Sequence, residues 1–411
     1  MKRLIAVMLA LALLLTACAQ GNADDLMQNV PAKAVDVLPD MDTGAAAAAD
    51  FGVRLFQASV EEGKNTLISP LSVLYALAMT ANGADGNTLA QMEQVLGMET
   101  EELNSFMRAY LDLLPESKVY KLSLANSIWF KDDPRFQVEQ SFLQTNADYY
   151  GADAYKAAFD EATRNDINNW VKEHTDGMIP EILDEIPEDA VMYLVNALAF
   201  DAEWQEIYEA HQVWEGEFCL EDGTPRTVDL MHSEENRYLE DELATGFIKY
   251  YKDKQYAFAA LLPNEGVTVQ EYVDSLTGEH LMKLLSNPEK VTVFATMPKF
   301  ETEYSVEMSE ALMEMGMTDA FDYRISDFSR LGTYDADGLN ICINRVLHKT
   351  FISVSEKGTR AGAATAVEMV AEGALLIENY KTVTLDRPFV YMLIDCQTNL
   401  PFFIGTMMDV G

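Results

Sequence analysis

The chain has 411 residues and a hydrophobic content of 49%, which is enough to bury the core of one large domain and argues against disorder over most of its length. Its 29 lysine and arginine residues against 67 aspartate and glutamate residues give a formal charge of −38. Because nucleic-acid binding requires cations that neutralise phosphates, this charge excludes such a function and is typical of a soluble surface that attracts cationic partners.

Residues 1–17 have the pattern of a secretory signal, with two cations before an apolar run at residues 4–15. The signal ends in Leu15, Thr16, Ala17 and Cys18, which resembles the bacterial lipobox, in which the cysteine is lipidated and becomes the mature N-terminus. We therefore expect a lipoprotein of the cell envelope, anchored at the outer face of a bacterial membrane or released extracellularly, with a flexible tether at residues 18–49. The alternative is an ordinary cleaved signal with an incidental cysteine.

Residues 50–411 are expected to form one α+β domain, because no repeat or linker marks a boundary between two. Helices are predicted from Ser69 and Pro70, from Thr88 with Gln91 in a capping-box spacing, and around a face formed by Ile167, Trp170 and Val171. Strands become frequent after about residue 190, and the clearest β-branched and aromatic runs lie at residues 258–262, 291–295, 351–354 and 390–394.

No sequence signature of catalysis is present: the chain contains no GxSxG, HExxH or GxxxxGK motif, and its five histidines are dispersed. Apart from Cys18, the cysteines are Cys219, Cys342 and Cys396, without metal-ligand spacing, and they are interpreted as core residues. The sequence therefore predicts neither an enzyme nor a bound cofactor or metal.

The unusual segment is EKGTRAGAATAV at residues 356–367, which follows a strand-like run and contains almost only small side chains. Such a segment can be a loop in water, and it can also enter a sheet, where alternate side chains face the interior. Counted from Thr359, the inward positions are Thr359, Ala361, Ala363 and Thr365, while Arg360 faces solvent. Composition alone also fits a flexible alanine- and glycine-rich loop.

Residues 356–365 resemble the reactive-loop hinge of inhibitory serpins, namely Glu356, Lys357, Gly358, Thr359, Arg360, Ala361, Gly362, Ala363, Ala364 and Thr365. Other segments resemble serpin helix and sheet signatures in the same order, and together they cover about residues 50–410: NTLISPLSVLYALAM from residue 65, LVNALAFDAEW from 194, MPKF from 297, NRVLHKTFISV from 344, and RPFVYMLI with LPFFIG between 387 and 405.

The resemblance implies a serpin fold of three β-sheets and about eight to nine helices, with an exposed reactive loop at about residues 357–386. It implies suicide-substrate trapping, in which a protease cleaves the loop and the loop then inserts into the central sheet. The family's shutter maps to Ser69, Ser72, Asn196 and His348, and its breach maps to Trp204. The family's spacing puts the scissile region at Val370, Ala371, Glu372 and Gly373, although the stretch to Pro388 is longer than in common members.

The expected partner is a serine protease, or a cysteine protease trapped in the same way. The apolar residues around the scissile region favour an elastase-like or papain-like target, whereas the spacing alone favours a Glu-specific one. Heparin-type activation is not expected, because the region at residues 99–115 is acidic and would repel a sulfated chain. The protein is expected to be a monomer. The alternative hypotheses are a non-inhibitory serpin and a lipid-anchored binding protein.

Overall fold

The computed structural model describes residues 23–37, 39–114, 120–187, 190–335, 338–359 and 379–411. Within these residues there are nine α-helices, a number that agrees with the predicted eight to nine: α2 (Met41–Ser59), α3 (Pro70–Ala81), α4 (Gly86–Leu96), α5 (Thr100–Leu113), α6 (Gln140–Tyr150), α7 (Glu161–His174), α8 (Val269–Ser275), α9 (Gly278–Ser286) and α10 (Ser309–Glu314). No helix in these ranges is long and apolar enough to span a bilayer.

The strands form the three large sheets that were predicted, and β4 (Phe136–Val138) makes an additional small pair with β14 (Gly332–Tyr334). Sheet A has the order β1 (Asp24–Asp25), β5 (Asp153–Ala157), β3 (Tyr120–Lys131), β6 (Met192–Glu203), β16 (Gly358–Thr359), β15 (Arg345–Ser355) and β13 (Phe300–Glu307). Sheet B has the order β2 (Thr66–Ile68), β19 (Pro401–Met407), β18 (Phe389–Asp395), β11 (Tyr256–Pro263), β10 (Ala244–Tyr250) and β9 (Tyr238–Glu240). Sheet C has the order β17 (Tyr380–Thr384), β12 (Thr292–Pro298), β8 (Pro225–Glu235) and β7 (Val213–Cys219).

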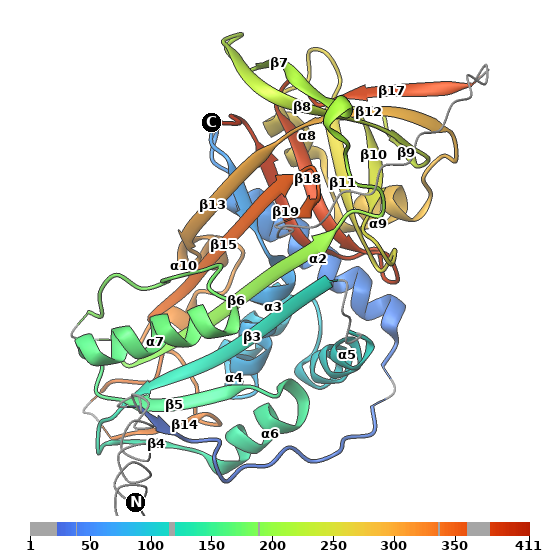
Figure 1. Ribbon diagram of the computed structural model, residues 1–411. Coiled ribbons are helices and arrows are strands. Elements are labelled where there is room, and N and C mark those ends of the chain that lie inside the picture. The colour runs from blue at the N-terminus through green and yellow to red at the C-terminus, as the bar shows by residue number, and fades with distance from the viewer. Residues whose placement is uncertain (1–22, 38, 115–119, 188–189, 336–337, 360–378) are drawn as a thin grey trace, which may run out of the picture.

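Helix α3 lies between two of these layers, because it packs against β6 of sheet A and against β19 of sheet B. All of its residues are buried, which fits its nearly uniform apolar sequence. As predicted, Pro70 occupies the first turn and the Ser69 hydroxyl accepts a hydrogen bond from the Ser72 amide at 3.4 Å. On the other face of sheet A, α7 lies across β3 and β6 (Figure 1). The start of α3 is thereby held beneath the middle of sheet A.

The predicted helix start at Thr88 is wrong. Helix α4 begins at Gly86 and is capped by Asp85, whose side chain accepts a hydrogen bond from the Gly86 amide at 2.9 Å. The Thr88 hydroxyl instead accepts a hydrogen bond from the Asp327 amide at 2.9 Å, which the local sequence could not indicate. The predicted end at Gly97 is confirmed, since Gly97 has the left-handed conformation expected after a helix.

The four predicted strand runs lie in or overlap β11, β12, β15 and β18, and the face of Ile167, Trp170 and Val171 is buried on α7.

The prediction that the three cysteines are core residues is wrong at one position. Cys342 is buried and Cys396 is partly buried, but Cys219 is exposed on β7. An edge strand of a small sheet leaves one face to solvent, so a strand position need not be a core position.

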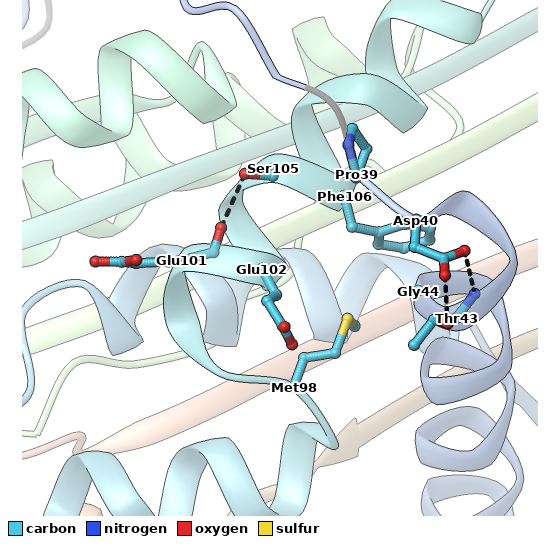
Figure 2. Close-up of a pocket in the computed structure, with 9 residues that line it drawn as sticks. All are labelled: Pro39, Asp40, Thr43, Gly44, Met98, Glu101, Glu102, Ser105 and Phe106. Carbon is cyan, nitrogen blue, oxygen red and sulfur yellow. Dashed lines mark hydrogen bonds between the residues drawn. The ribbon is translucent and has the colours of Figure 1, made fainter.

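The prediction of a flexible tether at residues 18–49 is also wrong at two places. Asp24 and Asp25 pair with β5, and α2 begins at Met41, capped by Asp40. Figure 2 shows Phe106 of α5 against the first turn of α2, where a Cβ on Gly44 would lie 2.2 Å from the ring. Within the alanine run, Ala45, Ala48 and Ala49 are buried, whereas Ala46 is exposed, and the small side chains on the buried side let the neighbouring elements come close. A hollow of about 320 Å³ beside this contact has Asp40, Glu101 and Glu102 in its lining.

Candidate functional site

The two middle strands of sheet A separate along their length. β6 and β15 pair in parallel from Tyr193 and Arg345 up to Ala197 and Lys349. In the part of the chain that the structure describes, no ladder pairing joins residues 198–201 of β6 to residues 350–353 of β15. We call these residues the parted stretch. Each of the two strands is paired there on its outer side only, with β3 and β13 respectively.

The beginning of the predicted hinge already lies between these strands at one end of the parted stretch. Gly358 and Thr359 form β16, which pairs antiparallel with β15 at Val354 and Ser355 and with β6 on its other side. The Thr359 side chain is only 1% exposed, so the inward direction predicted for it is confirmed. A Cβ on Gly358 would lie 2.0 Å from the Ala202 carbonyl oxygen, and a glycine is therefore required for this close approach.

Trp204 and Tyr251 hold this end of the sheet. The Trp204 indole donates a hydrogen bond to the Ser355 carbonyl at 2.8 Å, and its backbone amide donates to the Lys357 carbonyl at 2.9 Å. The Tyr251 ring stacks on Trp204 with centroids 4.5 Å apart, and its hydroxyl is hydrogen-bonded to the Thr359 hydroxyl. Trp204, the predicted breach residue, thus fixes the turn that precedes β16.

Glu356, the first hinge residue, is held by an ion pair. Its carboxylate lies 2.6 Å from the Lys299 ammonium, which also contacts Asp229 at 3.1 Å. Partial burial alone would raise the pKa of Glu356, but the hydrogen bond from Lys299 outweighs burial and holds this pKa below its usual value. The base of the hinge is therefore fixed at neutral pH by a charge pair that the sequence did not reveal.

His348 and Ser69 meet beneath the point where the strands part. His348 lies on β15 and is 2% exposed, and its Nε2 accepts a hydrogen bond from the Ser69 amide at 3.0 Å. The ring is therefore neutral, with the proton on Nδ1. Burial lowers the pKa of His348 to about 3. This contact ties β15 to the start of α3 while the ring stays uncharged.

Asn196 lies directly across from His348 in the β6–β15 register and completes a polar row in the middle of the sheet. Its side-chain amide donates a hydrogen bond to Asn126 of β3, which is also its partner in the β3–β6 register. Ser72 is buried in the same region, but in the described residues its hydroxyl makes no hydrogen bond. The structure thus brings together Ser69, Asn196 and His348, and it adds Asn126, which sequence reasoning missed.

Several of the predicted site residues lie outside the residues that the structure describes. They are Cys18, the second part of the hinge (Arg360, Ala361, Gly362, Ala363, Ala364 and Thr365) and the scissile region (Val370, Ala371, Glu372 and Gly373). The chain rejoins the described structure just before β17, at the edge of sheet C. Their predicted roles remain predictions.

In the described residues, the middle strands of sheet A are thus parted, and Gly358 and Thr359 of the same chain lie between them at one end. The chain belongs to the serpin family, since a family model described as Serpin (serine protease inhibitor) matches residues 46–410. Members of this family are typically inhibitors of proteases rather than enzymes.

Two kinds of relatives agree with this assignment. Serpin B10 of Sorex araneus is 30% identical over 396 residues, which cover 87% of this chain and 96% of that protein. The crystal structure of the thermophilic serpin tengpin in its native state is 48% identical, covers 94% of this chain and 100% of that chain, and has a TM-score of 0.90. The latent state of the same serpin is 48% identical, covers 92% and 100% of the two chains, and has a TM-score of 0.80. The described structure is thus more similar to the native state.

Proposed function

We propose that the chain inhibits a protease as a suicide substrate, by inserting its cleaved reactive loop into sheet A. The observation that carries this proposal is the position of Thr359, which is buried between β6 and β15, while in the described residues these two strands are not paired with each other along the parted stretch. Residues Ala361, Ala363 and Thr365 continue the same alternation and are small enough to follow Thr359 inward.

The proposed driving force is the completion of sheet A. Each residue that inserts offers its backbone to β6 on one side and to β15 on the other, and each hydrogen bond contributes about 0.5–1.5 kcal/mol net. The side chains of the inserted strand are removed from water in the same step. The native state therefore has a higher free energy than the state with the inserted loop, and this free energy is released only after the loop is cut.

The proposed trapping step is a competition between two rates. The nucleophile of the target protease attacks the loop and forms an acyl-enzyme, as serine and cysteine proteases do with any substrate. Insertion then carries the attached protease away before water releases it. This chain supplies no acid or base to the reaction, and its contribution is mechanical.

For the target, we favour an elastase-like serine protease, because small and medium apolar residues surround the scissile region and no lysine or arginine lies between Thr365 and Asn379. A papain-like or a Glu-specific protease is the alternative. We propose that the protein acts as a monomer tethered by a lipid on Cys18. Heparin is not proposed as an activator, because Glu101 and Glu102 of α5 and the nearby Asp40 would repel a sulfated chain.

The proposal is tested by incubating the purified domain with elastase-like, Glu-specific, trypsin-like and papain-like proteases. A denaturant-resistant complex on a gel supports trapping, and mass spectrometry of the released C-terminal peptide identifies the scissile bond. Cleavage by every protease without any covalent complex would instead support a non-inhibitory serpin. The absence of both cleavage and complex would favour a lipid-anchored binding protein.

A further inference from the structure

Three of the large apolar side chains that are exposed in the described residues lie on one loop before β15. Tyr323, Ile325 and Leu339 are 48%, 56% and 43% exposed. The Asn340 amide donates a hydrogen bond to the Tyr323 carbonyl at 2.9 Å, which places Leu339 beside Tyr323. We call the three side chains the apolar tip, and residues 322–335 and 338–340 the tip loop. Single exposed apolar residues need no explanation, whereas a group of them marks a surface that contacts another apolar surface.

The apolar tip lies beyond the end of sheet A that is far from the hinge. Residues 338–344 lead into β15, whose first residue, Arg345, pairs with Tyr193 near the start of β6. Thr359 of the hinge pairs with Ala202 near the end of the same strand. Because a strand rises about 3.3 Å per residue, these two pairs lie roughly 30 Å apart along β6. Figure 1 accordingly shows β14 of the tip loop and β17, which follows the reactive loop, at opposite ends of the molecule.

The first described strand lies at the same end as the tip loop. Asp24 of β1 pairs with Lys156 of β5. The Lys156 ammonium donates a hydrogen bond to the Phe136 carbonyl of β4 at 3.4 Å, and Phe136 pairs with Tyr334 of the tip loop. Only five residues separate Cys18 from Asp24 in the sequence. Since a chain of this length spans at most about 20 Å, a lipid on Cys18 keeps this end of the molecule close to the bilayer.

The charges of the tip loop are largely paired within the protein. Arg324 forms an ion pair with Asp322 and lies 5.9 Å from the ring centre of Tyr323, and Arg330 forms an ion pair with Asp85 at 2.7 Å. Both arginines of this loop thus already have a carboxylate partner, and the formal charge of −38 repels anionic lipids. The apolar tip therefore suits a zwitterionic surface, which it contacts through apolar side chains and through a tyrosine, a residue enriched at membrane interfaces.

We propose that the apolar tip rests on the bilayer that holds the chain's own lipid, with Tyr323, Ile325 and Leu339 in the interfacial region. This inference rests on the proposed lipid on Cys18, because three side chains bury too little apolar area to hold a protein at a membrane by themselves. The lipid makes the contact intramolecular, so a weak interaction is enough to orient the molecule. The reactive loop then faces away from the membrane, where a protease in solution can reach it.

The test measures hydrogen exchange of backbone amides in the full-length protein, purified with its lipid and reconstituted into phosphatidylcholine vesicles. Mass spectrometry of the N-terminal peptide first establishes the lipid on Cys18. Relative to the Cys18→Ala protein in solution, exchange in the tip loop should slow roughly fivefold or more, because contact with the bilayer restricts the opening of this loop and excludes water from it. Exchange in β17, at the opposite end of the molecule, should not change.

The decisive variant combines Ile325→Asp with Leu339→Asp. Both side chains are exposed, so the variant should melt at the temperature of the unaltered protein. It should stay on the vesicles, because its lipid is intact, but its tip loop should exchange as fast as in solution. Leu113→Asp is the matched control, since Leu113 is a 40% exposed leucine of α5 outside the tip loop, and it should keep the slow exchange.

The outcomes separate this inference from the proposed lipid anchor. If the lipidated protein is on the vesicles and its tip loop exchanges as fast as in solution, the orientation is wrong and the anchor stands. The same conclusion follows if Leu113→Asp abolishes the slow exchange as fully as the double variant does. Slow exchange of the tip loop in the Cys18→Ala protein at high concentration would indicate a second copy as the partner and overturn the proposal. A chain without lipid on Cys18 would overturn both.

Discussion

Replacing Thr359 with arginine should convert the inhibitor into a substrate. Thr359 is 1% exposed and lies between Val354 and Ala202, where the neighbouring Tyr251 hydroxyl is the polar group that it contacts. An unpaired cation in such a position costs several kcal/mol. To keep its guanidinium in water, the variant should withdraw position 359 from sheet A before cleavage. Insertion after cleavage must then bury the cation, which slows this step.

The magnitude follows from the rate competition. If about 3 kcal/mol is added to the insertion barrier, insertion slows by about 100-fold, while hydrolysis of the acyl-enzyme by the protease is unchanged. We expect cleavage at the same bond and at a similar rate, followed by release of active protease. The assay is the stoichiometry of inhibition together with the amount of denaturant-resistant complex on a gel.

Two control variants separate charge and hydrogen bonding from insertion. Thr359→Val keeps the volume and loses only the hydrogen bond to Tyr251, so trapping should largely persist. Arg360→Glu changes the charge of the adjacent residue, which the alternation assigns to the solvent side, and should leave trapping nearly unaltered. Trapping of protease by Thr359→Arg with the stoichiometry of the unaltered protein would refute the hinge assignment.

Three further predictions concern other parts of the chain. Cleavage between Ala366 and Leu376 should let the hinge insert and raise the thermal midpoint by about 10 °C or more, as several kcal/mol of added stability would; a nicked protein that melts no higher would exclude insertion. Cys18→Ala should abolish membrane association in cell fractionation without changing inhibition, and a variant still found in membranes would contradict the lipobox assignment. The folded-state pKa of His348, about 3, lies below the ordinary 6.5, so the unfolded chain binds a proton that the folded chain does not. Stability should therefore fall as pH drops below 6.5, by up to about 1.4 kcal/mol per pH unit from this group. In urea unfolding, His348→Gln should remove much of this slope, whereas the exposed control His211→Gln should not; equal slopes for the two variants would contradict the burial argument.

The sequence by itself determined the features that depend on neighbouring residues. Ser69 and Pro70 identified the start of α3, because a cap and a proline act within one helical turn. The small residues from Gly358 onward identified a segment able to enter a sheet, and the ordered motifs around it identified the fold and the family. In the structure, Gly358 and Thr359 pair with β15, and the Glu356 and Lys357 carbonyls accept hydrogen bonds from Tyr208 and Trp204.

Only the tertiary structure decided which distant residues meet. The register of β3 and β6 brings Asn126 next to Asn196, and the Thr88 hydroxyl accepts a hydrogen bond from the Asp327 amide. Residues 40–44 form a packed helix start because Phe106 lies against them. A cap or a period is visible locally, whereas register and packing depend on backbone pairings between remote segments, which no local pattern specifies.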